Sequence, residues 1–201
     1  MPAHEQPYHH GSLRQELLAS AEATLERDGV DKLSLRQLAR EAGVSHAAPG
    51  KHFRDRQALL DALAESGFHR MTGALERAVA DAPPTARARF SSLANAYVDF
   101  ALEHPGLLSL MYSNKHAPGA AETVVNAGGH ATMDLTVRLV SEAQAAGDIA
   151  AGDPESIALV AFATFHGVAT LAAGGMLGDV PVGEVVNAAS TVFWAGLSRA
   201  V

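Results

Sequence analysis

Apolar residues in the first 80 positions recur at spacings of three and four, the period of an amphipathic helix. Three such stripes cover residues 13–25, 35–42 and 59–68, and polar residues fill the opposite side of each. Asp55 can cap the helix of the third stripe, and the Pro83-Pro84 pair stops it. The pattern therefore predicts that the chain begins as a set of short helices around one small core.

The most informative stretch is residues 34–53, SLRQLAREAGVSHAAPGKHF, which predicts two short helices joined by a tight turn. Ser34 and Gln37 have the spacing of a capping box, which marks the start of the first helix. Gly43 supplies a left-handed residue that ends this helix, and Ser45 can cap the next. This layout is helix-turn-helix geometry, which places the second helix in the major groove of DNA.

Beyond residue 56 the sequence predicts longer helices. Expected elements are residues 87–104, a short segment 107–112, a long helix ended by Gly147, a helix opened by Asp153-Pro154, and residues 182–200. Aromatic residues make up only 5% of the chain and alanine is abundant, so we expect an all-α fold. Val192 and Phe193 lie on the apolar stripe of the last helix, which favours packing against a partner subunit.

Residues 157–177 are almost continuously apolar and long enough to cross a bilayer. Thr164, His166, Thr170 and a Gly174-Gly175 pair interrupt this run, and no Lys or Arg flanks it. A helix that is apolar on every side is also what the centre of a helical bundle requires. We therefore expect no membrane contact, and a helix with a pocket on one side and a partner subunit on the other.

Short motifs in the head carry a family resemblance: Ser34, Leu38-Ala39, Ala42-Gly43-Val44-Ser45, His52-Phe53, and Arg56 with Leu59. Over residues 8–63 they resemble the TetR family of transcriptional repressors. The resemblance implies a three-helix helix-turn-helix DNA-binding domain, residues 1–56, and a larger helical effector-binding and dimerisation domain, residues 57–201. One departure is Gly50, because the family usually has a tyrosine there that touches a DNA phosphate.

A weaker resemblance lies in the body. Phe165-His166-Gly167 is similar to the Trp-His-Gly signature of one group of TetR-like ligand domains, and residues 45–49 also look like that group. His166 is then a polar contact for an effector in an apolar cavity. The alternative is a core histidine bonded to a backbone carbonyl. Pocket walls are expected from the remaining candidates, each of which is also a normal core residue: Tyr97, Phe100, Met111, Met133 and Phe162.

Charge is distributed unevenly along the chain. Residues 1–56 hold eight Lys/Arg and eight Asp/Glu, whereas residues 57–201 hold seven and fourteen, so the net charge of −7 belongs to the body. Attraction to phosphates must then come from a local cluster, and we expect modest affinity per subunit and a need for dimers. The chain has no cysteine, hence no disulfide or thiolate metal site, and residues 1–11 lack the apolar segment of a signal peptide.

Candidate DNA contacts follow from the helix-turn-helix geometry and the family resemblance: Ser34, Arg36, Ser45, His46, Ala47, Ala48, Lys51, His52 and Arg56. Arg36 suits the O6 and N7 of guanine, and Ala47 can pack on a thymine methyl. Lys51 and Arg56 suit phosphates. The alternative for each is a solvated side chain without a contact. His4, His9 and His10 have no fixed second ligand pattern, so we expect neither a metal site nor a cofactor.

The sequence as a whole indicates a cytoplasmic, homodimeric repressor that a small-molecule effector releases from a palindromic operator on double-stranded DNA. One alternative is a helical ligand- or protein-binding module with weakened or lost DNA recognition, which Gly50 and the neutral head make plausible. An enzyme that uses His166 with a carboxylate is the other. We find no nucleophile elbow, phosphate loop or His-Glu-x-x-His motif, and so expect no enzymatic activity.

Overall fold

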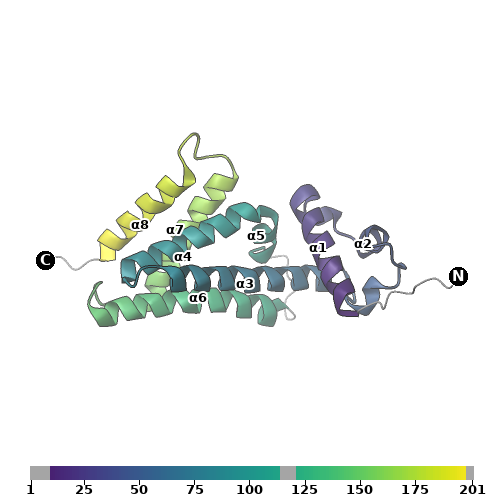
Figure 1. Cartoon of the computed structure of the whole chain (residues 1–201), viewed down its shortest axis with the longest axis horizontal. Helices are drawn as coiled ribbons and strands as arrows, with labels where there is room; N and C mark the ends of the chain where they lie inside the picture. The colour runs from purple at the N-terminus through teal and green to yellow at the C-terminus, as the bar shows by residue number, and fades with distance from the viewer. Residues whose placement is uncertain (1–9, 114–120, 198–201) are drawn as a thin grey trace.

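The computed structural model describes residues 10–113 and 121–197, and within these ranges every regular element is helical. The elements are α1 (His10–Asp28), η1 (Val30–Lys32), α2 (Leu35–Glu41), η2 (Pro49–Lys51), α3 (Arg56–Asp81), α4 (Ala86–Glu103), α5 (Pro105–Met111), α6 (Ala121–Ala146), α7 (Pro154–Ala173) and α8 (Val182–Leu197). The predicted all-α fold is confirmed. His4 and His9 lie outside the described residues. Figure 1 shows a small head of α1 and α2 at one end of a longer body.

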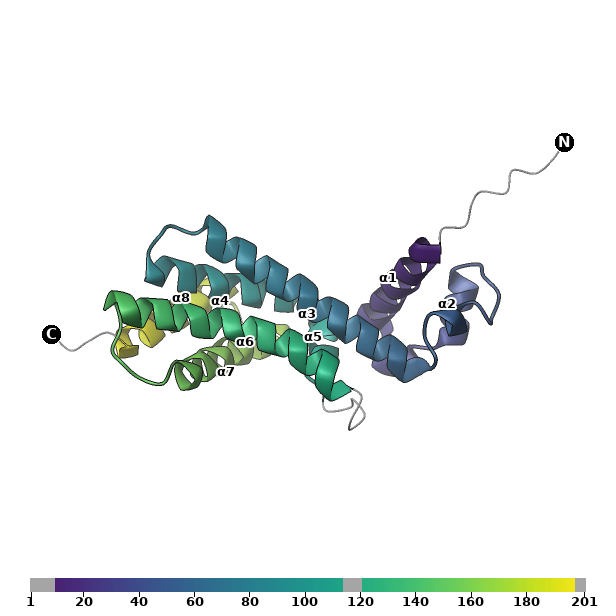
Figure 2. The same cartoon turned by 90° about the horizontal axis from the view of Figure 1, so that it is seen from below.

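The helix α3 runs without a break from the head into the body (Figure 2). The backbone N–H of Ala58 donates to the carboxylate of Asp55 at 2.8 Å, so the predicted cap is confirmed. Along α3, Leu59 and Leu63 are buried toward the head, and Met71 and Leu75 are buried in the body. The predicted boundary at residues 56 and 57 therefore falls in the first turn of a helix that both parts share.

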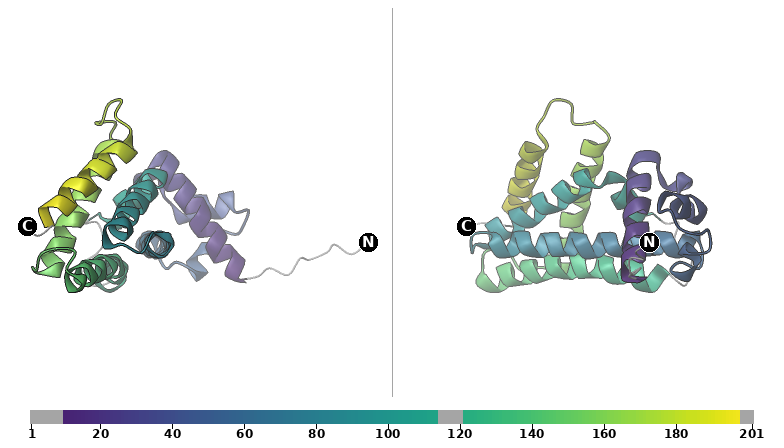
Figure 3. Two further views of the ribbon diagram at one scale, coloured as in Figure 1. Left: turned by 60° about the vertical axis from the view of Figure 1, so that its left-hand side comes forward. Right: turned by 45° about the vertical axis from the view of Figure 1, so that its right-hand side comes forward.

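In the body, α3 packs against α4 and α6, and α7 packs across α4 and α6. The outermost helix, α8, lies over α4 and α7 (Figure 3). Phe90 of α4 holds α8 in place: its ring stacks on Phe193 at 5.0 Å between centroids and 3° between planes. The rings of Phe165 and Trp194 lie 6.0 Å and 6.2 Å from that of Phe90.

Large apolar side chains remain exposed on α7, α8 and the segment between them: Leu159, Val160, Leu171, Met176, Val180 and Val192. Of the described helices, α7 alone is long and apolar enough to cross a membrane, and only 28% of that stretch is buried within the chain. Of the two residues expected on the partner-facing stripe of the last helix, Phe193 stacks on Phe90 within the subunit. Val192, which is 73% exposed, faces outward.

Candidate functional site

The first half of the helix-turn-helix has the predicted boundaries but not the predicted cap. Ser34 precedes α2 in an extended conformation, yet its side chain makes no capping hydrogen bond. Gln37 instead donates to the carboxylate of Glu41 at 2.8 Å, so the expected capping box is absent. Gly43 ends α2 at φ +65°, and Val44 N–H donates to the Ala39 carbonyl at 3.0 Å, as in a Schellman motif.

The second half is not the α-helix that we expected. Residues 46–48 form a turn, and residues 49–51 form the single 3₁₀ turn η2. An α-helix capped by Ser45 would need an N–H on residue 49 to donate to the Ser45 carbonyl, and proline has none. Ala48 N–H donates to that carbonyl instead, at 2.9 Å, which tightens the segment to a 3₁₀ pattern. The recognition element is therefore short and irregular.

The outer face of this element carries exposed side chains of the types that contact DNA. Arg36, His46, Ala47 and Lys51 are exposed, as are Ser45 and Gly50, whereas Ser34, Ala48 and His52 are partly buried. Neither Arg36 nor Lys51 forms an ion pair within the described residues. Phe53 is buried beneath them, as expected, and the Arg14 guanidinium lies 5.5 Å from its ring centroid.

Arg56 is engaged within the head. Its Nε donates to the Leu33 carbonyl at 2.9 Å, and its Nη2 donates to the Val30 carbonyl. These two bonds tie the first turn of α3 to the segment between α1 and α2. The sequence indicated only a basic residue at the start of a helix. The structure gives the guanidinium two backbone partners more than 20 residues away along the chain.

Two carboxylates of α1 connect the head to the body. Glu22 pairs with Arg70 of α3 at 2.8 Å. Glu26 accepts hydrogen bonds from the N–H groups of Gly106 and Leu107 at 2.8 and 2.9 Å, and so caps α5 from another helix. A Cβ at Gly106 would lie 2.8 Å from the Glu26 carboxylate, so a larger residue there would displace this carboxylate from its present position. Specific polar contacts therefore stabilise the head orientation seen here.

A cavity of about 120 Å³, partly open to solvent, lies where α6 and α7 meet the end of α5. It is lined by Tyr112, Gly129, Thr132, Met133, Thr136 and Phe162. A narrower extension of about 20 Å³ shares Thr132, Thr136 and Phe162 and reaches Tyr97 and Leu75. The structure therefore brings together three of the predicted wall residues, Tyr97, Met133 and Phe162.

His166 lies beside this cavity in a cluster of aromatic rings. Its Nδ1 is 2.8 Å from the hydroxyl oxygen of Tyr97, and its ring stacks on Phe162 at 5.2 Å. Burial lowers the pKa of His166. Burial, together with Tyr112, raises the pKa of Tyr97, and burial raises the pKa of Tyr112 to about 12. The three polar groups are uncharged at neutral pH, which makes the cluster a neutral hydrogen-bonding site.

Two of the predicted wall residues lie elsewhere. Phe100 packs on His104 at 4.9 Å and lines a surface groove between α3 and α4. Met111 is fully buried against Gly67 of α3. Sequence reasoning missed Tyr112, Thr132 and Thr136. The two threonines are four residues apart on one side of α6. A polar pair within an apolar stripe was therefore the sequence signal that could have indicated a pocket wall there.

Two family models match the chain. The model described as "Bacterial regulatory proteins, tetR family" matches residues 17–63, and the model described as "Tetracyclin repressor-like, C-terminal domain" matches residues 90–191, about half of the chain. The chain belongs to the TetR family. It is a transcriptional regulator with a helix-turn-helix DNA-binding head and a ligand-binding body. No curated protein matches this TetR-family chain.

Solved structures agree with the TetR fold. A protein of unknown function from Rhodococcus sp. RHA1 is 74% identical, with a TM-score of 0.90 over 97% of this chain and 100% of that chain. A regulatory protein in the tetR family from Rhodococcus RHA1 is 18% identical, with a TM-score of 0.74 over 94% and 98%. The TetR family transcriptional regulator PfmR from Thermus thermophilus is 16% identical, with a TM-score of 0.73 over 91% and 99%. The last two likenesses concern the fold alone.

The lowered pKa of His166 predicts how this residue contributes to stability. Above about pH 6.5, the ordinary value, His166 is neutral in both the folded and the unfolded TetR-family chain. Below it the unfolded state takes up a proton first, so the contribution of His166 is lost as the pH falls. The free energy of unfolding of the wild type minus that of His166→Gln should therefore shrink on acidification. Urea titrations followed by Trp194 fluorescence measure it, and a difference that grows would contradict the burial effect.

Proposed function

We propose that the chain is a homodimeric repressor that a small-molecule effector releases from a palindromic operator. The observation that carries this proposal is that the single helix α3 contacts both the body cavity and the core of the head. Leu75 lines the narrow extension of the body cavity, and Leu59 and Leu63 form the core under the head. An effector that alters the packing around Leu75 changes the position of α3, and with it the position of the head. It can do so only by its different affinity for the two arrangements.

We propose that Arg36, His46, Ala47 and Lys51 make the main DNA contacts, because they are exposed on the outer face of the head. Ser34, Ser45, Ala48 and His52 border this face. Arg56 contributes by positioning, since its guanidinium already binds two carbonyls. With a neutral head, one subunit offers few phosphate contacts, so two heads are needed for useful affinity.

The effector that suits the body cavity is small, mostly apolar and uncharged. Tyr97, Tyr112 and His166 are neutral at physiological pH, and a charged ligand would lose its hydration without gaining an ionic partner. Phe162 and Met133 offer apolar walls, and the hydroxyl groups offer one or two hydrogen bonds. We propose Tyr97, Tyr112, Met133, Phe162 and His166 as the ligand-binding residues.

The exposed apolar face of α7 and α8 supports a dimer. Burying it against a second copy removes Leu159, Val160 and Val192 from water, and one two-fold contact does so for both subunits. This occupant fits better than a bilayer, because Thr164, His166 and Thr170 lie on the same helix. The two heads would then reach successive major grooves about 34 Å apart. Such a regulator works in the cytoplasm beside its DNA.

A second candidate function is a ligand-binding module with weakened or lost DNA recognition. The 3₁₀ recognition segment favours it, since a single turn presents fewer side chains to the groove than a full helix. Titration of DNA from the chain's own promoter region at low salt separates the two. Specific binding at nanomolar to low micromolar concentration supports the repressor, whereas equal affinity for promoter and random DNA supports the module.

Replacing Lys51 and Arg36 by Ala should have different consequences for operator binding. Lys51→Ala removes one phosphate contact, so affinity for all sequences falls similarly and the log-log salt slope decreases by about 0.9. Arg36→Ala removes a base contact, at a cost of about 1–3 kcal/mol on the operator alone. Fluorescence anisotropy at several salt concentrations measures both effects. Arg77→Ala, an exposed arginine of the body, is the control. Equal losses on operator and random DNA for Arg36→Ala would contradict base reading.

Gly50→Tyr should tighten operator binding. Gly50 is exposed, its φ is not positive, and a Cβ built on it meets no atom within 4 Å. Tyrosine therefore fits, adds a hydroxyl for a phosphate and restricts the unfolded chain, for a gain of about 1–2 kcal/mol. Gly50→Phe, which lacks the hydroxyl, should give less than half of this gain. Weaker binding by Gly50→Tyr would show that the backbone at residue 50 approaches DNA closely.

A further inference from the structure

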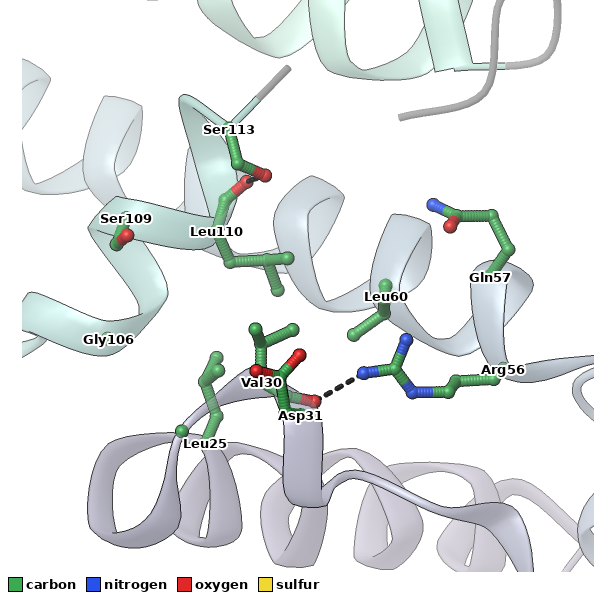
Figure 4. Close-up of a pocket in the computed structure, with 11 residues that line it drawn as sticks. Leu25, Val30, Asp31, Arg56, Gln57, Leu60, Gly106, Ser109, Leu110 and Ser113 are labelled. Atoms are coloured by element: carbon green, nitrogen blue, oxygen red, sulfur yellow. Dashed lines mark hydrogen bonds between the residues drawn. The ribbon is translucent and has the colours of Figure 1, made fainter. Parts of the chain in front are cut away.

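A cleft of about 350 Å³ lies at the joint between head and body, apart from the cavity beside His166. Three elements form it: the end of α1 with η1, the first turns of α3, and α5 (Figure 4). Leu25, Leu60 and Leu110 are buried residues that form its apolar surface. A volume above about 300 Å³ at a domain interface is typical of small-molecule sites.

The charged and polar groups of this cleft are arranged around the apolar surface. Arg56 reaches across from α3 and is held by the carbonyls of Val30 and Leu33 through Nη2 and Nε, while Nη1 makes no hydrogen bond with the described residues. The carboxylate of Asp31 lies on the same side of the cleft in Figure 4. Within the described chain, Asp31 and Arg56 do not form an ion pair with each other or with any other residue.

The position of the guanidinium is fixed before any ligand arrives. Two backbone carbonyls already hold Arg56, so a ligand carboxylate that binds Nη1 costs little further side-chain entropy. Asp31 would repel a simple carboxylate but attract an ammonium group. A ligand that carries an ammonium group and a carboxylate on the same carbon can pair with Asp31 and Arg56 together.

We propose that this cleft binds a hydrophobic α-amino acid. Its carboxylate pairs with Arg56, its ammonium with Asp31, and its side chain lies on Leu25, Leu60 and Leu110. The volume of about 350 Å³ lies at the small end of the range for small-molecule sites, which suits an amino acid of the size of phenylalanine or leucine.

A ligand in this cleft contacts head and body at once. Val30 and Asp31 belong to the head, and Ser109 and Leu110 belong to the body. Binding stabilises the head orientation seen here relative to any other orientation, in proportion to the ligand's preference for it. The cleft is therefore a second control point, independent of whether the body cavity binds an effector.

Calorimetric titration of the full chain with L-phenylalanine tests the proposal. The matched probes are phenylalaninamide, which lacks the carboxylate, and 3-phenylpropionate, which lacks the ammonium group. Each should bind about tenfold or more weakly than L-phenylalanine, because each leaves one charge of the cleft without its partner. No heat of binding with L-phenylalanine at millimolar concentration, or tighter binding of 3-phenylpropionate, would overturn the proposal.

Two variants locate the site. Asp31→Asn should weaken L-phenylalanine about tenfold without weakening 3-phenylpropionate. Ser109→Phe places a ring in the cleft from an exposed position on α5 and should abolish binding of both probes. His166→Phe in the body cavity should leave L-phenylalanine binding unchanged. If His166→Phe abolishes binding and Ser109→Phe does not, the amino acid occupies the body cavity and the cleft assignment is wrong. Circular dichroism verifies that each variant is folded.

Discussion

Val192→Asp is expected to convert the dimer into a folded monomer. Val192 is 73% exposed on α8, so an aspartate costs little within the subunit, but it buries an unpaired charge at the proposed contact. An uncompensated buried charge costs about 3–5 kcal/mol, and the two-fold axis places the change in both copies. Sedimentation velocity at micromolar concentration should then show a monomer, and operator affinity should fall with it.

The neighbouring residue supplies the control for this experiment. Phe193→Asp places a charge against the ring of Phe90 inside the subunit and should unfold the body. Val192→Thr has nearly the same shape without a charge and should remain a dimer. A folded dimer for Val192→Asp at the same concentration would remove this face of α8 from the interface.

Phe90→Ala is expected to destabilise the body by about 3–5 kcal/mol, because it removes a buried ring and leaves a cavity among three aromatic partners. The loss should be accompanied by a change in the native emission of Trp194, the single tryptophan of the chain, since its ring lies 6.2 Å from that of Phe90. Urea denaturation followed by fluorescence and by circular dichroism measures both.

Phe100→Ala is the matched control on the same helix. Phe100 is also buried but packs on His104, on the side of α4 that faces the groove with α3. It should destabilise the fold while leaving the native emission of Trp194 unchanged. A loss below about 1 kcal/mol for Phe90→Ala would show that α8 is held mainly by other contacts.

Local signals predicted the element boundaries well, since they depend on residues within one helical turn. Asp55 and Asp153 cap α3 and α7 as expected, and Gly43 ends α2. The error at the recognition element was also local. Pro49 lacks the N–H that an α-helix starting after Ser45 would use, and the sequence contained this information.

Long-range packing could not be predicted from the pattern. Val192 and Phe193 share one apolar stripe, yet only the position of Phe90 decides that Phe193 packs inside the subunit. Tyr97 and His166 were both candidates, but the hydrogen bond that joins them spans 69 residues. Phe100 and Met111 are apolar residues of suitable type that face other parts of the core. The types of residue that line a pocket can thus be predicted from the sequence. Which particular residues line it depends on how the helices are arranged.

Because α3 is unbroken, a small tilt of this helix in the body produces a larger displacement at its end in the head. Its 26 residues span about 39 Å at a rise of about 1.5 Å per residue. If the end near Asp81 stays fixed, a tilt of about 5° displaces the end at Arg56 by about 3 Å, roughly two residues of helical rise. In the proposed dimer, two heads that move in opposite senses double that change. Such an adjustment is large compared with the tolerance of a hydrogen bond, so under the proposed mechanism repacking by a fraction of an ångström around the cavity would misalign both heads with their grooves.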